Sequence, residues 1–413
     1  MNVDDGVRQL LERSSLGMIV KVKSVGSRGM GGYCVGHSLM IRLSDQFEIV
    51  LAHDWLVGLR GGEWVLDQLA QMTGPTKLYT MVSNGQPLTD AIDACEVITS
   101  SLQRLPGAAG RCRRWYLPLM PRAVTQMKVA PCDLIISTSS AFIKSIPVPS
   151  GAAHLCYCHS PARYLWEQTH DYAQGQGGRL RSLGLSFTGP RLRSWDKKTS
   201  ASVTKFLANS QHTAHRIERC YGRKAQVCYP PVRVGYFTPD ENIERQPWWL
   251  VVAALEPYKR TDLVIDAARR GGFALKVAGS GSQFEELRRH APEHVEFLGR
   301  VTDEHLRQLY RQARGLIFPQ LEDFGIIAVE AQASGCPVLA FGEGGALEIV
   351  TPETGWLFND VTAHGIAGAV KAAAADQRDS KACVANAQRF SPSVFEQSIA
   401  DAVDALMRVK KGS

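Results

Sequence analysis

No apolar run in this chain reaches the roughly 18 residues that a membrane-spanning helix needs. The best early candidate, residues 16–22, is short and is interrupted by Lys21. We therefore predict neither a signal peptide nor a membrane anchor, and we expect a cytoplasmic protein. Peripheral contact with the inner face of the cytoplasmic membrane is compatible with this prediction.

The ten cysteines lack the regular spacing of a disulfide framework, which favours reduced thiols. One cluster, His154, Cys156, Cys158 and His159, contains residue types that bind zinc. Its Cys-x-Cys-His spacing differs from that of a zinc knuckle, and no matching Cys/His pair follows it. We predict no zinc site at this position.

A dinucleotide-binding fingerprint is also lacking. Residues 26–36 (GSRGMGGYCVG) are rich in glycine, but no clear strand–helix unit follows them. This disfavours an oxidoreductase with a Rossmann cofactor site. Residues 1–46 show little periodicity, and we predict that they form a flexible N-terminal extension.

The net charge is +7, and the basic residues are clustered. Such patches suit an anionic partner, either membrane headgroups or nucleic acid, whereas a solvated basic face is the structural alternative. We expect peripheral contact with an anionic membrane surface and no nucleic-acid partner. The first cluster flanks an apolar WYLPLM segment; the two clusters are Arg111, Arg113, Arg114, Arg122 and Lys128, and Arg179, Arg181, Arg191, Arg193, Lys197 and Lys198.

A chain of 413 residues is long enough for two domains with separate cores. Regular structure is predicted to begin at Glu48, with a buried strand in EIVLAHDWL and a helix in LRGGEWVLDQLAQM. Strands and helices then alternate, which predicts a parallel sheet covered on both faces. The further predicted strands of this half are 77–82, 133–137, 153–158, 205–208 and 225–229.

A second alternating series follows a pause near Pro230-Pro231 and the polar run 238–247. We therefore predict an α/β protein with two Rossmann-like domains, residues 47–237 and 248–390, facing each other across a cleft. A closing helix at 392–410 could pack back on the first domain. The predicted strands of the second domain are 249–254, 273–278, 295–298, 315–319 and 337–341, with helices at about 260–270, 283–290 and 303–312.

Residues 318–341, FPQLEDFGIIAVEAQASGCPVLAF, carry two carboxylates, Glu322 before a predicted helix and Glu330 about two turns inside it. Glu330 lies in an otherwise apolar helix, so its carboxylate needs a partner or a ligand. Glu322 could bind a ligand too, or it could merely start the helix, where acidic residues favour the helix dipole. A nucleotide-sugar fits this pattern, because its diphosphate would suit the amides of the helix N-terminus, those of Phe324, Gly325 and Ile326.

Further candidates lie near the ends of predicted strands. Lys259 could neutralise a leaving diphosphate, with solvation of a helix start as the alternative. His159 could hydrogen-bond a sugar hydroxyl or a phosphate, with a satisfied core histidine as the alternative. Gly61 and Gly62 would let backbone amides approach a phosphate closely. Glu348, which follows a Gly-Gly pair, is a further polar candidate.

These stretches together resemble the retaining GT-B glycosyltransferases of family 4. In the second half the resemblance rests on EPYKR, LGRVTDEHL, FPQLEDFGIIAVEAQASGCPVLA and GGALEIV. The first half is similar to a mannosyltransferase-like subgroup of bacterial O-antigen and exopolysaccharide biosynthesis. The matching stretches there are VLAHDWLVGLRGGEWVL, YLPLMPRA, DLIISTSSAF, HLCYCHSPARYLWE, RLRSWD, FLANSQHTAHRI and YPPV, so the resemblance covers about residues 48–358.

The resemblance implies a donor held mainly by the second domain, an acceptor on the first, and no required metal or other cofactor. It implies that Glu330 binds the donor ribose and that Glu322 binds hydroxyls of the sugar. Lys259 would bind the diphosphate, and His159 would lie near the transferred sugar. Backbone contacts to sugar and phosphate would come from Phe324, Gly325 and Ile326 and, across the cleft, from Gly61 and Gly62; the base would lie near Gly299, Arg300 and Val301.

One position departs from the family pattern. The family usually has an arginine four or five residues before the lysine, where this chain has Ala254, and Glu256 adds a negative charge nearby. A lost bidentate phosphate contact would weaken stabilisation of the leaving group by about a few kcal/mol. Either Arg300 or another basic residue compensates, or the activity is low.

By resemblance, the expected activity is transfer of a hexose, mannose from GDP-mannose, to a saccharide or lipid-linked saccharide in bacterial surface polysaccharide biosynthesis, such as lipopolysaccharide. Retention without an obvious nucleophile fits front-face displacement, and covalent catalysis by Glu322 is the competing route. Two alternatives stay open. The donor could be a UDP- or ADP-linked sugar, and Ala254 also fits a non-catalytic nucleotide-binding scaffold.

Overall fold

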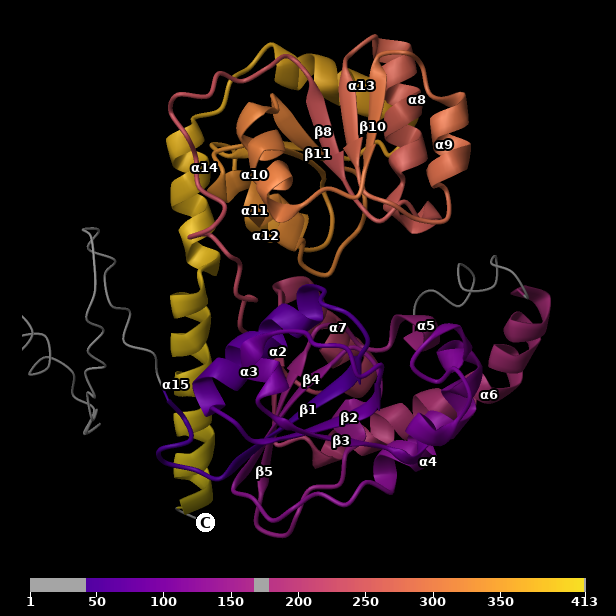
Figure 1. Ribbon diagram of the computed structural model, residues 1–413, viewed down its shortest axis with the longest axis vertical. Coiled ribbons are helices and arrows are strands. Elements are labelled where there is room, and N and C mark those ends of the chain that lie inside the picture. The colour runs from indigo at the N-terminus through magenta and orange to yellow at the C-terminus, as the bar shows by residue number, and fades with distance from the viewer. Residues whose placement is uncertain (1–41, 167–177, 412–413) are drawn as a thin grey trace, which may run out of the picture. The chain divides into compact units, whose positions relative to one another are not determined.

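The computed structural model describes residues 42–166 and 178–411. These residues form two parallel sheets, each built from strands that alternate with helices (Figure 1). The first sheet has the strand order β3-β2-β1-β4-β5-β6-β7, and the second has the order β10-β9-β8-β11-β12-β13. Neighbouring strands pair in parallel throughout. Both sheets belong to one compact unit, residues 40–413. The predicted α/β class with two Rossmann-like sheets is confirmed.

The bounds of the elements follow chain order. The strands are β1 Ile49–Leu56, β2 Lys77–Ser83, β3 Glu96–Thr99, β4 Leu134–Ser139, β5 Ala153–Cys158, β6 Lys205–Ala208 and β7 Ala225–Val227, then β8 Trp249–Val252, β9 Leu275–Ala278, β10 Val295–Gly299, β11 Gly315–Phe318, β12 Val338–Phe341 and β13 Gly355–Phe358. The helices of the first half are α2 Gly61–Thr73, α3 Asp90–Asp93, α4 Met120–Thr125, α5 Arg163–Trp166, α6 Gly178–Thr199 and α7 Gln211–Tyr221. Those that follow are α8 Thr261–Gly271, α9 Phe284–His290, α10 Asp303–Gln312, α11 Ile326–Ala333, α12 Ala346–Ile349, α13 Ala363–Ala374, α14 Ser380–Ala387 and α15 Pro392–Lys411.

The central strands are apolar on both faces because helices cover both faces. Along β1, Ile49 and Leu51 point into one core and Val50 and Ala52 into another, as the two-residue period of a strand requires. The second sheet likewise has a core on each face. This double burial explains why near-continuous apolar runs, rather than alternating ones, predicted the central strands.

The closing helix α15 packs on the first half, although it follows the second half in the chain (Figure 1). Its apolar residues Phe395, Ile399 and Val403 belong to the core that contains Leu51. Nε2 of Gln68 on α2 donates a 2.7 Å hydrogen bond to Oε1 of Glu396 within this contact. The helix therefore brings the end of the chain back onto the first half.

The sequence pattern missed several elements, and a physical reason can be given for three of them. Strand β3 lies at the edge of its sheet and its side chains are mostly exposed, so it has no apolar pattern. Strand β13 is the other sheet's edge and is only four residues long. Helix α6 contains Pro190 and many basic residues, which obscured its 22-residue length.

Most of the predicted N-terminal extension, residues 1–41 of 1–46, lies outside the described residues. The described residues of this extension are packed, because Leu43 is buried in the core that contains residues of α2. The Leu43 amide donates to the Met72 carbonyl at 2.9 Å. The nine described cysteines are free thiols. Within residues 42–166 and 178–411, no helix is both long and apolar enough to cross a membrane.

Candidate functional site

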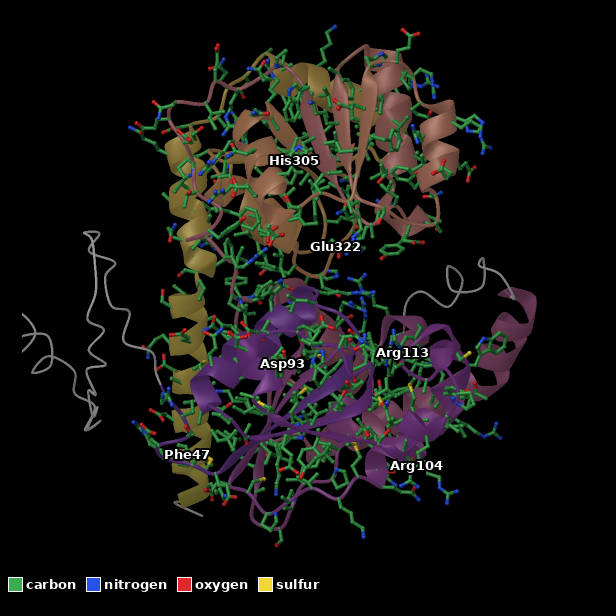
Figure 2. The ribbon with its side chains drawn as sticks, viewed as in Figure 1. Phe47, Asp93, Arg104, Arg113, His305 and Glu322 are labelled. Atoms are coloured by element: carbon green, nitrogen blue, oxygen red, sulfur yellow. The ribbon has the colours of Figure 1, made fainter. Side chains whose placement is uncertain are left out.

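An acidic loop, residues 320–325, connects β11 to α11 at the carboxyl edge of the second sheet, where Figure 2 labels Glu322. Gly325 has φ +115°, and a Cβ there would lie 3.0 Å from the Phe318 ring, so the sharp entry into α11 needs glycine. Helix α11 begins at Ile326. The amides at this helix start are those that we predicted for the phosphate.

A Gly-Gly turn packs against the acidic loop from the β12 side. The amide of Gly345 donates to the Glu322 carbonyl at 2.9 Å. A Cβ at Gly344 would lie 2.4 Å from that carbonyl oxygen, and a Cβ at Gly345 would lie 2.2 Å from the Phe324 carbonyl oxygen. These glycines support the loop, and helix α12 behind them is only four residues long. From sequence, the two glycines in GGALEIV suggest a second anion-binding helix start, whereas in the structure they support the acidic loop.

Lys259 and Glu322 meet, although 63 residues separate them in the chain. Lys259 ends a short 3₁₀ turn, Pro257–Lys259, after β8, and its Nζ contacts Oε1 of Glu322 directly. The two sheets' topology explains the meeting, because β8 and β11 are neighbours and their carboxyl ends lie side by side. A cation and a carboxylate thus occupy the place where the sequence predicted diphosphate and sugar contacts.

Glu330 is buried on α11, as its apolar surroundings predicted. Burial raises the pKa of its carboxyl to about 8, and Arg233, with Nη2 3.8 Å from Oε1, opposes the shift. The same arginine pairs with Asp303 at 2.7 Å and stacks over the Trp64 ring of α2, 4.5 Å from its centroid. Arg233 is a site residue that the sequence did not suggest, because it lies in the connection between the two sheets.

His159 follows β5 in the first half, where its amide donates to the Ser139 carbonyl at 2.8 Å. Burial, with neighbouring His53 as a second cause, lowers the pKa of His159 to about 4. Its buried Nε2 has no hydrogen-bond partner among the residues that the structure describes. A neutral imidazole with an unused nitrogen can therefore bond an incoming hydroxyl.

The glycine pair Gly61-Gly62 forms the first residues of α2 rather than a loop before it. A Cβ at Gly62 would lie 3.5 Å from Nε2 of His159. A Cβ at Gly61 would lie 2.9 Å from Cδ1 of Ile326, the first residue of α11. The N-termini of α2 and α11 therefore meet, with His159 beside them, and glycine permits this approach.

The predicted base contacts lie at the end of β10. Gly299 has φ +65°, and its carbonyl accepts from the Gly279 amide at 2.7 Å. Arg300 is exposed, and Val301 is partly buried. The structure adds Gly279 and Gly281, which the sequence did not single out: Cβ atoms there would lie 1.8 Å and 2.3 Å from the backbone oxygens of Ala253 and Leu255.

Two acidic candidates have structural partners. Both carboxylate oxygens of Glu348 accept from backbone amides at the start of α7, Gln211 at 2.8 Å and His212 at 3.2 Å. Glu348 therefore caps a helix, as acidic groups at helix N-termini do. Glu256, which we expected to disturb a phosphate, accepts from the amide of Ser282 at 3.1 Å and from its hydroxyl at 2.7 Å.

The side chains of His154, Cys156 and Cys158, the cluster considered for zinc, are buried on β5 of the first sheet. Nε2 of His154 lies 2.7 Å from the Ser137 hydroxyl, and burial lowers the pKa of His154 to about 3. Burial raises the pKa of Cys156 to about 12. Within the described ranges, no three His, Cys, Asp or Glu side chains gather as metal ligands. Metal independence stays a prediction.

Residues 237–390 match the family model described as "Glycosyl transferases group 1". Among curated relatives, a D-inositol 3-phosphate glycosyltransferase of Mycobacteroides abscessus is 31% identical over 45% of this chain and 53% of the relative. A GDP-mannose-dependent monoacylated alpha-(1-6)-phosphatidylinositol monomannoside mannosyltransferase of Corynebacterium glutamicum is 31% identical over 38% of this chain and 50% of the relative. The chain thus spans about half the length of these relatives.

Solved structures show the same fold over almost the whole chain. Sucrose-phosphate synthase from Thermosynechococcus elongatus covers 88% of this chain and is itself covered completely, with a TM-score of 0.68 and 17% identity. Anabaena HepE in complex with UDP covers 87% of this chain, with all of its own chain covered, a TM-score of 0.62 and 16% identity. At such identities the likeness establishes the two-domain GT-B fold and nothing finer.

Proposed function

We propose that this protein is a retaining glycosyltransferase of the mannosyltransferase-like family 4 subgroup. It would transfer a hexose, with GDP-mannose as the expected donor, to a saccharide or lipid-linked saccharide in bacterial surface polysaccharide biosynthesis. The observation that carries the proposal is the meeting of Glu322 and Lys259 at the start of α11, about one helical turn from Glu330 and opposite His159. The match of residues 237–390 to the glycosyltransferase model supports it.

The donor would lie along α11. Its ribose hydroxyls would bond Glu330, its diphosphate would bind the amides of residues 324–326, and its sugar hydroxyls would bond Glu322. Lys259 would turn from Glu322 to the phosphate, because the diphosphate carries more negative charge than a carboxylate. GDP-mannose is favoured because relatives with about 30% identity carry GDP-mannose-dependent names; a UDP- or ADP-linked sugar is the alternative.

In the proposed mechanism the bond between the sugar's anomeric carbon and the diphosphate oxygen breaks while the acceptor oxygen bonds that carbon from the same face. The acceptor's proton passes to the leaving phosphate oxygen, and the electron pair of the broken bond stays on the diphosphate. Lys259 and the α11 N-terminus hold the charge that develops there. Neutral His159 would donate to or accept from a sugar hydroxyl. In the competing covalent route, Glu322 would attack the anomeric carbon.

One arginine of the first half lies near Glu322 and Lys259, close to where the family's missing arginine is expected. Nη2 of Arg163, from the first half, lies 3.9 Å from Oε2 of Glu322, beside the Lys259 contact. Arg300, the replacement that the sequence suggested, is exposed at the far end of the predicted donor. Because Asp323 binds the same Nη2 at 2.6 Å, Arg163 is held by the neighbour of Glu322, and we expect Lys259 to be the cation at the phosphate.

Peripheral membrane contact on the cytoplasmic side is part of the proposal. The 3₁₀ segment Arg111–Leu119 exposes Trp115 and Leu119 by 54% and 49%, and the exposed basic residues Arg104, Arg122 and Lys128 flank it in the chain. Exposed aromatic and aliphatic side chains among basic residues suit an anionic membrane interface. A lipid-linked acceptor would be presented at such a surface.

Donor hydrolysis by the purified full chain tests the proposed function. Wild type and the Glu322→Gln variant are incubated without added metal with GDP-mannose and with UDP- and ADP-sugars, and thermal shifts are recorded with the free nucleotides. We expect slow cleavage of GDP-mannose by the wild type only, and stabilisation by GDP. Cleavage of another nucleotide-sugar instead would replace GDP-mannose as the proposed donor. If no donor is cleaved and no nucleotide stabilises the protein, a non-catalytic scaffold would be favoured.

A further inference from the structure

The residue next to Glu322 joins the two halves of the molecule. Oδ2 of Asp323 accepts from Nη2 of Arg163 at 2.6 Å and from its Nε at 3.0 Å. Oδ1 of Asp323 contacts Nη1 of Arg216 directly. Arg163 is on α5 and Arg216 is on α7, so both arginines come from the first half, 160 and 107 residues away in the chain.

Two of the three members of this network are buried, unlike those of an ordinary surface ion pair. Asp323 is 7% exposed and Arg216 is 1% exposed. Burial alone would raise the pKa of Asp323, but Arg163 and Arg216 lower it, so the carboxyl stays ionised. Removing one member of a buried charged network leaves the other charge without its partner, which makes such a network strongly coupled.

The first-half side of the network is itself held in place. Nε1 of Trp166, at the end of α5, donates to Asp196 at 2.9 Å, and Asp196 pairs with Lys144 at 2.7 Å in the core. Arg193 donates to the Leu165 carbonyl at 2.9 Å. Helix α5, which carries Arg163, is therefore fixed to α6 and to the sheet.

The network also reaches the segment that carries His159. Nη1 of Arg216 donates to the hydroxyl of Ser160, the next residue after His159, at 2.8 Å. Asp323 thus links Glu322 in the second half to His159 in the first half through two hydrogen-bonded side chains. From sequence, Asp323 could merely start a helix, where acidic residues favour the helix dipole. In the structure its carboxylate oxygens accept from these two arginines.

We propose that Asp323 is a positioning residue that, by bonding Arg163 and Arg216, fixes the acidic loop so that Glu322 and the start of α11 face His159. This inference rests on the proposed function for its kinetic consequence. The donor nucleotide would be bound by Glu330 and α11 within the second half. Loss of the contact should therefore misplace the reacting groups and leave nucleotide binding largely intact.

A double-mutant cycle tests the proposal. Asp323→Asn, Arg163→Gln and the double variant are compared with wild type for kcat of donor hydrolysis and for Kd of the nucleoside diphosphate. We expect kcat to fall about 10–100-fold in each single variant, because small misplacements of reacting groups have such effects. The double variant should lose little more, and Kd should change less than about threefold. Asp266→Asn, which breaks an exposed pair on α8, serves as the matched control.

Hydrogen–deuterium exchange of residues 319–326 provides a readout that does not need turnover. Both single variants should exchange faster in this loop, while the control should not. Arg163 is 24% exposed on its side chain, so Arg163→Gln should fold even if Asp323→Asn does not. Unchanged exchange, additive losses of kcat, or parallel losses of kcat and nucleotide affinity would overturn the proposal. If the wild type cleaves no donor, the proposed function fails, and the exchange result still decides the role of Asp323.

Discussion

The two Rossmann-like halves present chemically different groups to the proposed site. In the second half, Glu322 and Glu330 each lie by a cation, Lys259 and Arg233 respectively. In the first half, His159 is kept neutral by burial. The comparison teaches that charge on the diphosphate would be balanced by the second half, while the first half offers a neutral hydrogen-bonding group to the sugar.

The largest effect is expected when a positive charge is removed from the second half. Lys259→Ala should reduce donor turnover about 10²–10³-fold, because it removes a positive charge from the leaving diphosphate. Lys276→Ala is the control, since Lys276 pairs with exposed Glu296 at 3.1 Å on the second sheet. Steady-state hydrolysis measures both. Turnover by Lys259→Ala within tenfold of wild type would show that another group holds the charge.

A smaller effect is expected on the neutral side. His159→Ala should lower turnover about tenfold, the equivalent of one hydrogen bond to a sugar hydroxyl, and His159→Gln should lose less because it keeps a neutral donor. Since the pKa of His159 is lowered to about 4, the ratio of wild-type to Ala-variant turnover should be constant from pH 5.5 to 8. A ratio that titrates near pH 6.5 would instead indicate that an imidazolium acts.

The pH dependence of stability sharpens the comparison further. The folded-state pKa of Glu330, about 8, exceeds its usual 4.5, so the folded chain holds this proton more tightly. Its stabilising contribution is complete below pH 4.5 and is lost as the pH rises to 8. Relative to wild type, Glu330→Gln should therefore gain a few °C in melting temperature between pH 5 and pH 8. Thermal melts of both proteins at pH 5 and pH 8 test this expectation. An equal difference in melting temperature at the two pH values would contradict the shifted pKa.

The smallest effect is expected at the exposed 3₁₀ segment of the first half. Replacing Trp115 and Leu119 by serine should weaken binding to vesicles that contain anionic lipid by about 3–10-fold, because apolar area is lost at the interface. Hydrolysis of the soluble donor should not change. Val409→Ser, which alters an exposed apolar residue on α15, is the control. Equal vesicle binding by all variants would remove this segment from the proposed membrane contact.

Much of the second half could be predicted from sequence because its signals are local. Glu322, Glu330 and the start of α11 lie within nine residues, and α10 was predicted with its observed bounds, 303–312. Strand order then brings Lys259 to Glu322, because β8 and β11 are neighbouring parallel strands whose carboxyl ends lie at one edge of the sheet. Their chemical roles remain predictions.

The contacts between the halves could not be predicted in the same way. Asp323 meets Arg163 from 160 residues away, and no periodicity relates two such positions. Arg233 lies in the connecting segment, between Pro230-Pro231 and the polar run 238–247, where the sequence showed no site motif. Glu348 looked like a ligand-binding group, yet its partners are the amides of α7. A carboxylate alone does not reveal whether a ligand or another part of the chain satisfies it.

Nucleotide binding by α11 is the central claim, and calorimetric titration tests it most directly. The nucleoside diphosphate that stabilises the wild type is titrated into wild type and into Glu330→Gln at pH 8.5, where Glu330 is largely ionised. We expect binding to the variant to be at least about tenfold weaker, because charged hydrogen bonds to the ribose hydroxyls are lost. Equal affinities would place the nucleotide elsewhere and contradict the account.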